Sequence, residues 1–466
     1  MTAEKLTKKQ TLMVAIIIIG GFVTFLNQLA MSPALPSVMR EYGITAATGQ
    51  WLTSVFLLVN GLMVPVTAFL ISRFSSRKIY ITAMSAFTVG SVVAALSNGF
   101  FMLLLGRIIQ AVGAGIMIPF VTVMLMLIFP KSRRGFAMGI SGVVIGFAPA
   151  FGPTLAGLIV DAWGWRYIFV MIAPIAAVLM ILAIVKLENI GETRDVKLDK
   201  LSLVLSTAGF GGLLYGFSTA GSIGWTSLTT IIPIACGAVI IVFFARRQLR
   251  ISEPMLNLRV LKNGLFSVST ILAGIISAGL TVGAVITPIY LQNVLGLSAT
   301  QSGLLLMPGA LCMVAMSPVS GILFDRFGPR ALSITGLSIL TAGSVMLVFL
   351  TVNSTFLYVC LGYSLRMFGM SMINMPVNTW GLNMLPNRLL AHGNAINNTA
   401  RQVCGALGTA VLITVMMTVA SNSGLHGAYA TVDGINAAFM AALGLTTVAL
   451  ILAIVRVKGN GYEKNK

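Results

Sequence analysis

The sequence predicts an all-α membrane protein, and three observations support this. Of the 466 residues, 57% are hydrophobic and only 9% are charged, with a mean hydropathy of +0.97. A soluble domain carries roughly 25% charged residues, because its surface must face water. Apolar runs of about 20 residues, the length that crosses a bilayer as a helix, recur along the chain. The basic residues also gather in alternate connecting segments.

Fourteen apolar runs, separated by short charged or Gly/Pro-rich turns, are expected to form membrane-spanning helices. They cover residues 12–38, 51–71, 79–97, 101–128, 136–160, 167–187, 201–219, 226–245, 264–291, 300–323, 331–351, 355–384, 393–419 and 435–455. An even number of spans places both termini on the same side of the membrane. No cleavable signal is evident, since the first apolar run continues into a full span.

The basic residues support this topology. With the N-terminus inside, all but five of the 30 lysines and arginines fall in segments on the cytoplasmic side, where positive charge gathers in membrane proteins. The exceptions are Arg40 and Arg166 outside, and Arg107, Arg366 and Arg401 within spans. The net charge of +19 therefore reflects membrane topology, and a nucleic-acid partner is not expected.

Few residues could support catalysis or bind a metal. The four cysteines lie in apolar stretches without a C-x-x-C pair, so neither a metal site nor a disulfide framework is predicted. No H-E-x-x-H, G-x-S-x-G or Walker pattern occurs, and none of the eleven acidic residues falls in the middle of a span. We therefore expect a protein that is not an enzyme and has no cofactor.

A weak internal repeat divides the chain. The turn after the second predicted helix, with Arg73 and Arg77, matches the turn after the tenth, with Arg326 and Arg330. Parallel repeats of this kind build transporters that move around a site near the middle of the membrane. The repeat predicts a six-helix bundle over 1–190, two additional spanning helices with linkers over 191–262, and a second six-helix bundle over 263–466.

Several motifs resemble the major facilitator superfamily. Gly321 to Arg330 is similar to its G-x-L-x-D-R-x-G-R-R loop, and Leu105 to Gly115 resembles its fourth-helix arginine motif. Gly139, Ala148, Gly152-Pro153 and Ala156-Gly157 follow its fifth-helix antiporter motif, with two glycines replaced by alanine. With fourteen spans, the chain most resembles the lincomycin-resistance type of the drug:proton antiporter branch. Leu26-Asn27-Gln28, Ala34-Leu35-Pro36 and Gln50 to Thr53 point to that subgroup.

Two groups of functional residues are expected. Because polar groups within spans avoid lipid, a substrate cavity is expected to be lined or adjoined by Asn27, Gln28, Arg107, Gln110, Arg366, Asn374 and Asn378. A conformational switch is expected to involve Arg73, Arg77, Gly152, Pro153, Asp325, Arg326 and Arg330. In this switch, the Asp325 carboxylate can pair with Arg326 or Arg330 and lie near a helix N-terminus, where negative charge is favoured. The fifth helix is expected to seal the periplasmic side of the cavity.

The sequence departs from the antiporter pattern at its acidic residues. Many relatives carry a titrating acid in the first helix, where this chain has Asn27, and the first-half turn has Ser72 in place of an acid. A buried carboxylate commonly neutralises cationic substrates. Neutral, zwitterionic or anionic substrates are therefore favoured. Proton coupling would have to use Asp161, Asp325 or His392, or act indirectly, so the coupling ion stays open.

These features predict a secondary active transporter that works as a monomer in a bacterial cytoplasmic membrane. It is expected to export small amphipathic molecules, such as drugs or antibiotics, by alternating access driven by a proton or other ion gradient. The alternative is an importer or facilitator of a small neutral or anionic metabolite with the same fold.

Overall fold

The computed structural model describes residues 7–191 and 199–457, which form thirteen α-helices, three short 3-10 helices and no strand. The first eight α-helices are α1 Lys8–Tyr42, α2 Ala46–Arg73, α3 Ser76–Ala95, α4 Phe100–Ile128, α5 Arg134–Trp163, α6 Arg166–Lys186, α7 Lys200–Ile223 and α8 Leu228–Arg250. The others are α9 Gly264–Asn293, α10 Ala299–Val348, α11 Phe356–Asn383, α12 Leu390–Asn422 and α13 Ala428–Arg456. The 3-10 helices are η1 Lys131–Arg133, η2 Leu258–Lys262 and η3 Asn387–Leu389.

Helix α10 contains two of the predicted spans. It is 50 residues long and bends at Gly328, whose φ of 77° lies in the left-handed region that glycine adopts readily. Its two limbs match the predicted spans 300–323 and 331–351, so the thirteen helices account for fourteen segments. Twelve helices of the described residues, with α10 counted once, are long and apolar enough to cross a membrane.

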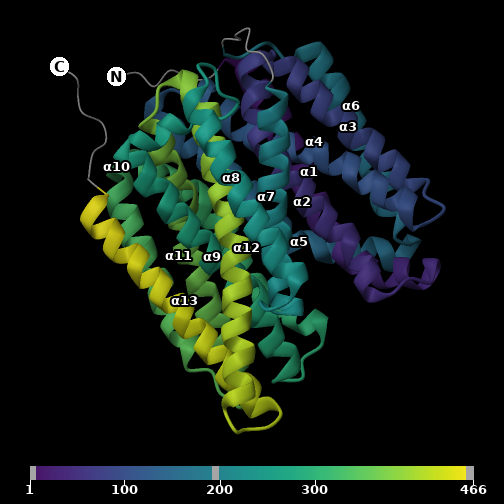
Figure 1. Cartoon of the computed structure of the whole chain (residues 1–466), viewed down its shortest axis with the longest axis vertical. Helices are drawn as coiled ribbons and strands as arrows, with labels where there is room; N and C mark the ends of the chain where they lie inside the picture. Colours follow the sequence, from purple (N-terminus) through teal and green to yellow (C-terminus); the bar gives the residue numbers. More distant parts are fainter. Residues whose placement is uncertain (1–6, 192–198, 458–466) are drawn as a thin grey trace.

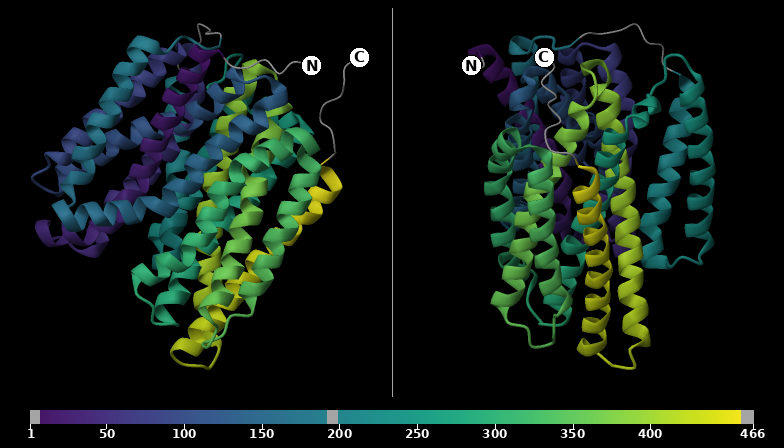
Figure 2. Two further views of the ribbon diagram at one scale, coloured as in Figure 1. Left: turned by 180° about the vertical axis from the view of Figure 1, so that it is seen from behind. Right: turned by 90° about the vertical axis from the view of Figure 1, so that its left-hand side faces the viewer.

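The helices form two groups and a separate pair. In one group α1, α3, α4, α5 and α6 pack together, with α2 against α4, while the other contains α9 to α13. The pair α7 and α8 stands beside them (Figure 2), and α7 contacts both α2 and α12. The start of α1 and the end of α13 lie at the same end of the molecule, here called the proximal end (Figure 1). The opposite end is called the distal end.

The two groups repeat the same close packing. A Cβ at Gly90 of α3 would lie 2.5 Å from the backbone nitrogen of Gln110 in α4, and one at Gly343 of α10 would lie 2.8 Å from the backbone nitrogen of Arg366 in α11. The spacing between Gly90 and Gly343 equals that between Arg73 and Arg326 in the repeated turns. Arg366 is therefore the structural counterpart of Gln110, and the repeat extends from the turns into the helices.

Candidate functional site

The two groups of helices are joined at their proximal ends by a carboxylate. Asp325, at the end of the first limb of α10, accepts hydrogen bonds from the backbone N–H groups of Gly135 and Phe136, both at 2.9 Å. These N–H groups belong to the first turn of α5, where the helix dipole favours negative charge. The described partners of the carboxylate are thus backbone groups of the opposite group. Arg326 and Arg330, the partners considered from the sequence, are exposed and bond to it nowhere in the described structure.

Side-chain amides extend this connection. Arg134 of α5 donates to Oδ1 of Asn383 at 3.2 Å and to Oδ1 of Asn387 at 3.0 Å. Asn394, in the first turns of α12, donates to the backbone carbonyl of Pro119 in α4 at 3.0 Å. Among the described residues, the hydrogen bonds between the two groups therefore lie in the proximal half of the molecule, while the groups diverge toward the distal end (Figure 2).

Glycines allow the close approach of α5 and α10. A Cβ at Gly139 would lie 2.7 Å from the backbone oxygen of Ser317, and Gly135 faces Gly321 just as tightly. Such gaps exclude any larger side chain. In this conformation Gly135 and Gly139, in the first part of α5, pack against α10 in the proximal half. That the fifth helix seals the periplasmic side of the cavity stays a prediction. Gly152 is buried, and Pro153 lies outside the described side chains.

A layer of polar side chains crosses the middle of the molecule. Asn397 of α12 donates to Oδ1 of Asn378 in α11 at 2.5 Å, and Asn60 of α2 donates to Oε1 of Gln28 in α1 at 3.4 Å. A Cβ at Gly61, next to Asn60, would lie 2.8 Å from Oε1 of Gln402, which brings the two groups of helices together at this level. We define the polar layer as Gln28, Asn60, Asn374, Asn378, Asn397, Arg401 and Gln402.

Arg401 faces the space between the two groups. On α12, Asn397 points to α11 and Gln402 points to α2, and the 100° step per residue places Arg401 between these two directions. It also shares a helix face with Asn394, which contacts α4. Arg401 is half-buried, and no hydrogen bond or ion pair joins it to another described residue. Asn374, one turn from Asn378 on the antiparallel α11, lies at its level.

Arg107 and Gln110 belong to the interior of the first group. Both side chains are fully buried. Arg107 lies 4.2 Å from the ring centroid of Phe56 and donates to the Leu52 carbonyl and to Gln110, while Gln110 donates to Ser91 of α3 at 2.8 Å. They avoid lipid, as predicted, but they contact α2 and α3 rather than the opposite group. A role at a cavity stays a prediction for them.

Arg366 and Asn27 are buried with incomplete hydrogen bonding. Arg366 donates to the Gly279 carbonyl at 2.8 Å and lies 5.4 Å from the Phe439 ring, while its Nε and Nη1 have no partner in the described structure. Asn27 is fully buried, and neither its Nδ2 nor its Oδ1 has a described partner. An unsatisfied buried polar group costs about 1–3 kcal/mol. Buried polar groups without partners are uncommon in folded proteins, and a cavity that admits water or substrate would explain them.

The basic switch residues of the first-half turn have different surroundings. Arg77 is exposed and donates to the backbone carbonyl of Ile184 in α6, so it ties α3 to α6 within one group. Arg73 is half-buried and lies 5.8 Å from the ring centroid of Phe74. Ser72, the counterpart of Asp325, bonds to the Ala68 carbonyl of its own helix. Among the described residues, a carboxylate that joins the two groups of helices, here called the clasp, is therefore present in the second-half turn and not in the first-half turn.

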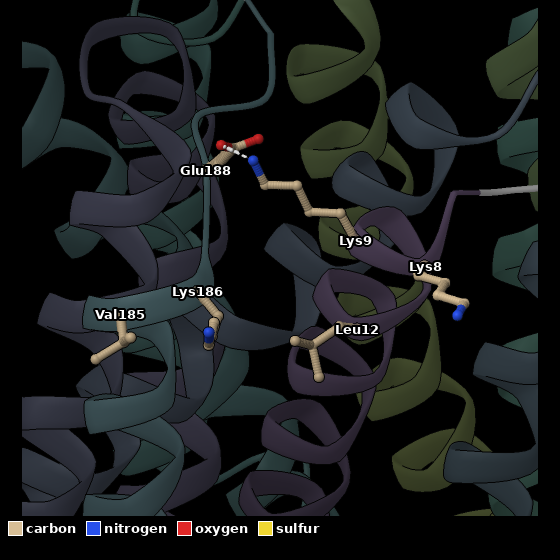
Figure 3. A pocket seen from close by; sticks show the side chains of 6 residues that line it. All are labelled: Lys8, Lys9, Leu12, Val185, Lys186 and Glu188. Atoms are coloured by element: carbon tan, nitrogen blue, oxygen red, sulfur yellow. Dashed lines mark ion pairs between the residues drawn. The ribbon is translucent and has the colours of Figure 1, made fainter.

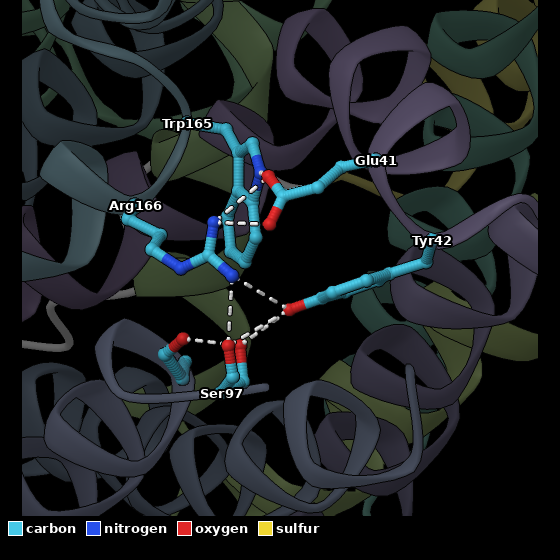
Figure 4. A network of polar contacts seen from close by, with 6 residues as sticks. Glu41, Tyr42, Ser97, Trp165 and Arg166 are labelled. Atoms are coloured by element: carbon cyan, nitrogen blue, oxygen red, sulfur yellow. Dashed lines mark hydrogen bonds and ion pairs between the residues drawn. The ribbon is translucent and has the colours of Figure 1, made fainter. Parts of the chain in front are cut away.

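The distal ends of the first group are held by a separate network (Figure 4). The Glu41 carboxylate accepts from Trp165 Nε1 and from Arg166 Nη1, both at 2.8 Å. Arg166 also donates to Tyr42 at 3.2 Å and to the Ser97 carbonyl at 2.9 Å. The network joins α1, the α3–α4 turn and α6, so these helix ends are braced as one unit.

Four members of the polar layer were not among the residues expected at the cavity. Asn60 is one of them. The run from Asn394 to Gln402, which contains Asn397, Arg401 and Gln402, begins near the membrane surface, where helix capping and interhelix hydrogen bonding are the expected roles. A signal for Arg401 was available, since it shares a helix face with Asn394 and Asn398. The sequence does not show whether that face of the helix is directed to lipid, to its own group of helices or to the opposite group.

Comparisons with known proteins agree with this architecture. Residues 17–409 match the family model described as Major Facilitator Superfamily. The uncharacterized MFS-type transporter YcnB of Bacillus subtilis is 44% identical over 450 residues, which cover 96% of this chain and 95% of that protein. The lincomycin resistance protein LmrB of Bacillus subtilis is 40% identical over 407 residues, 86% of this chain and 84% of that protein. LmrB of Listeria monocytogenes is 39% identical over 403 residues, 86% of each.

Two solved structures share the fold. The human organic anion transporter MFSD10 has a TM-score of 0.68 and covers 95% of this chain and 99% of its own. The proton:xylose symporter XylE has a TM-score of 0.67 and covers 97% of this chain and 96% of its own. Both are only 14% identical in sequence.

Proposed function

We propose that this chain, which belongs to the major facilitator superfamily, exports small amphipathic molecules by alternating access. The family match and the curated relatives confirm the predicted fold and identify a multi-pass membrane transporter of small molecules rather than an enzyme. Export is favoured by the 39–40% identity to lincomycin resistance proteins over most of the chain. The structural observation that carries the proposal is the polar layer, which lies between two groups of helices hydrogen-bonded to each other in the proximal half.

The arrangement supports an orientation and a mechanism. The proximal end carries the excess of basic residues, so we assign it to the cytoplasm, with both termini there, in a bacterial cytoplasmic membrane. The contacts of Asp325 and of the α5 glycines then close the cytoplasmic side in this conformation. Transport would alternate this state with one in which those contacts separate, with units 1–190 and 263–466 moving against each other and 191–262 alongside, in a single monomer.

Substrate charge is proposed from the arginines. No acidic residue falls in the middle of a predicted span, and Arg107 and Arg366 are fully buried against neutral groups. Arg401 is half-buried in the polar layer and faces the opposite group. Because an unpaired charge in a low-dielectric site acts strongly on a bound ligand, neutral, zwitterionic or anionic substrates are favoured over dications. Arg401 is the group we assign to contact the negative or electron-rich part of the substrate.

The energy source is proposed to be a proton gradient or another ion gradient. With no acid in the middle of a span, the candidates for proton binding are Asp325 and Asp161 at membrane edges and His392 in the first turn of α12. Asp325 is favoured among these because its carboxylate bonds to the opposite group of helices. Protonation removes the negative charge that the α5 N-terminus binds, so a proton there alters the clasp.

A flux assay tests the proposal. The purified protein is reconstituted in vesicles with a lincosamide or a neutral amphipathic dye, with and without a pH gradient of each sign. Proton-coupled export predicts that the substrate moves in the direction opposite to the flow of protons. It also predicts that Arg401→Gln lowers the transport of anionic and zwitterionic substrates more than that of neutral ones. Substrate that moves in the same direction as the protons would favour the importer alternative. A substrate flux that does not depend on any applied ion gradient would favour a facilitator.

A further inference from the structure

A pocket of about 420 Å³ lies at the proximal end of the first group, between the start of α1 and the end of α6 (Figure 3). It is lined by Lys8, Lys9, Leu12, Val185, Lys186 and Glu188. Helix α1 supplies the first three of these residues, and the end of α6 with the following turn supplies the others. The pocket is separate from the polar layer and is not involved in the transport mechanism described above.

The charges of the pocket are unequal. Lys9 forms an ion pair with Glu188, the one acid that lines it. Lys8 and Lys186 are exposed, and no ion pair joins either of them to an acid in the described part of the chain. The first turn of α1 lies here as well, and a helix N-terminus adds partial positive charge. Among the described residues, positive charge therefore exceeds negative charge at the pocket, which favours a negatively charged ligand.

The pocket also opens onto an apolar surface. Along α6, the side chains of Ile175, Val178, Leu182 and Val185 are 39% to 66% exposed and recur at helical spacing, whereas Ala176, Leu179 and Ala183 between them are buried. In a spanning helix, an exposed apolar stripe faces lipid chains. This stripe ends at Val185, next to Lys186, and Leu12 of α1 is exposed in the same pocket. Positive charge thus lies directly at the end of a lipid-facing surface.

We propose that this pocket binds the headgroup of an anionic phospholipid, with Lys186 at the phosphate, Lys8 at the far edge of the pocket and the acyl chains along Val185 and Leu12. Basic pockets between spanning helices on the cytoplasmic side suit such headgroups. The apolar lining favours a lipid over a free phosphate ion, which would leave Leu12 and Val185 in water. The leaflet follows from the proposed orientation, while the binding itself does not depend on what the protein transports.

The test measures lipid binding to the full chain without substrate. A fluorescent phosphatidylglycerol is titrated into protein in phosphatidylcholine nanodiscs, with unlabelled lipid as competitor. The double variant Lys8→Gln with Lys186→Gln is compared with Arg250→Gln with Lys262→Gln, which removes two positive charges from the same end of the molecule outside the pocket. Each basic residue near an anionic membrane surface contributes about 1 kcal/mol. We expect about thirty-fold weaker binding in the pocket variant and little change in the control.

Competition with inorganic phosphate distinguishes a site for a phospholipid headgroup from a site for the free phosphate ion. A lipid site predicts that phosphate at concentrations of tens of millimolar leaves phosphatidylglycerol bound, whereas a site for the free ion predicts displacement. An equal loss of binding in the two double variants would show that surface charge alone attracts the lipid, and would overturn the proposal. Because no flux is measured, this result is independent of the export hypothesis.

Discussion

The Asp325 carboxylate bonds to the backbone N–H of Gly135 at 2.9 Å, and this contact joins the two groups of helices at the proximal end. It is a charge-assisted hydrogen bond to the first turn of a helix, and the adjacent N–H of Phe136 adds a second. The carboxylate is half-buried, so water competes only in part. The closed proximal state should therefore depend on this single side chain more than on the exposed arginines of the same turn.

Asp325→Asn should shift the protein toward states with an open proximal end. A neutral amide keeps one acceptor but loses the charge, and hydrogen bonds to charged groups contribute about 1.5–3 kcal/mol, so the closed population should fall about tenfold or more relative to the open one. Spin labels at the exposed Lys78 and Arg388, one in each group, would report the distance between proximal ends. Arg330→Gln, which removes an exposed charge from the same turn, is the control. Equal distance distributions in Asp325→Asn and the unmodified protein would contradict this role.

Gly139→Ala should oppose the same closure by a steric route. The added Cβ would lie 2.7 Å from the Ser317 oxygen and 3.1 Å from the Pro318 Cα, and neither backbone atom can move alone. Overpacking of this kind costs about 1–3 kcal/mol. The spin-label distances should lengthen and the transport rate should fall. Gly303→Ala makes the same change on α10, where a Cβ meets no atom within 4 Å, and it should leave both readouts unchanged.

Asn27→Asp should move substrate preference toward cations. The Asn27 side chain is fully buried without a described partner, so a carboxylate there would be poorly solvated and would act strongly on nearby charge. Two unit charges about 8 Å apart interact by about 2 kcal/mol at an effective dielectric constant of about 20, so the new carboxylate would strengthen the binding of a cationic substrate. Cells that express each form would be tested for accumulation of a matched cationic and neutral dye. Asn263→Asp, at the N-cap of α9, adds the same charge elsewhere. Strong export of a dication by the unmodified protein would contradict the proposed substrate charge.

The ion pair between Asp199 and Arg247 should stabilise the α7–α8 pair across most of the pH range. Hydrogen bonds from Arg247, at 2.7 and 3.0 Å, and from Ser202 lower the pKa of Asp199 from 3.8 to about 2 despite partial burial. Since the pKa is lower in the folded protein, the stabilisation is complete above pH 3.8 and is lost as the pH falls toward 2.

The measurement compares Asp199→Asn with the unmodified protein in thermal unfolding at several pH values. Because the arginine side chain is 38% exposed, water screens the pair and the difference should be small. It should stay constant from pH 8 to pH 5 and shrink below pH 4. Glu253→Gln, an exposed acid in the linker after α8, should show no such difference. A difference that grows on acidification would mean that the pair does not form.

Much of this architecture could be predicted because it depends on one-dimensional patterns. The number of apolar segments, their alternating direction and the family follow from hydrophobic length, charge placement and local motifs, which do not depend on the details of packing. Gly328 illustrates the limit: the sequence placed a turn near it, and the structure shows one helix that bends there instead of two separated helices. The burial of Arg107, Arg366, Asn374 and Asn378 was also predictable, since polar groups avoid lipid.

The sequence by itself determined which residues had to be buried, and the tertiary structure decided what they contact. Gln110 and Arg401 are both polar residues within spans, yet one bonds to Ser91 inside its own group and the other faces the opposite group. Asp325 likewise pairs with the α5 N-terminus rather than with the arginines beside it. The physical reason is that hydrophobicity fixes the position of a residue along the membrane normal. The direction of a side chain depends on the rotation of each helix, which is set by packing against helices far away in the sequence.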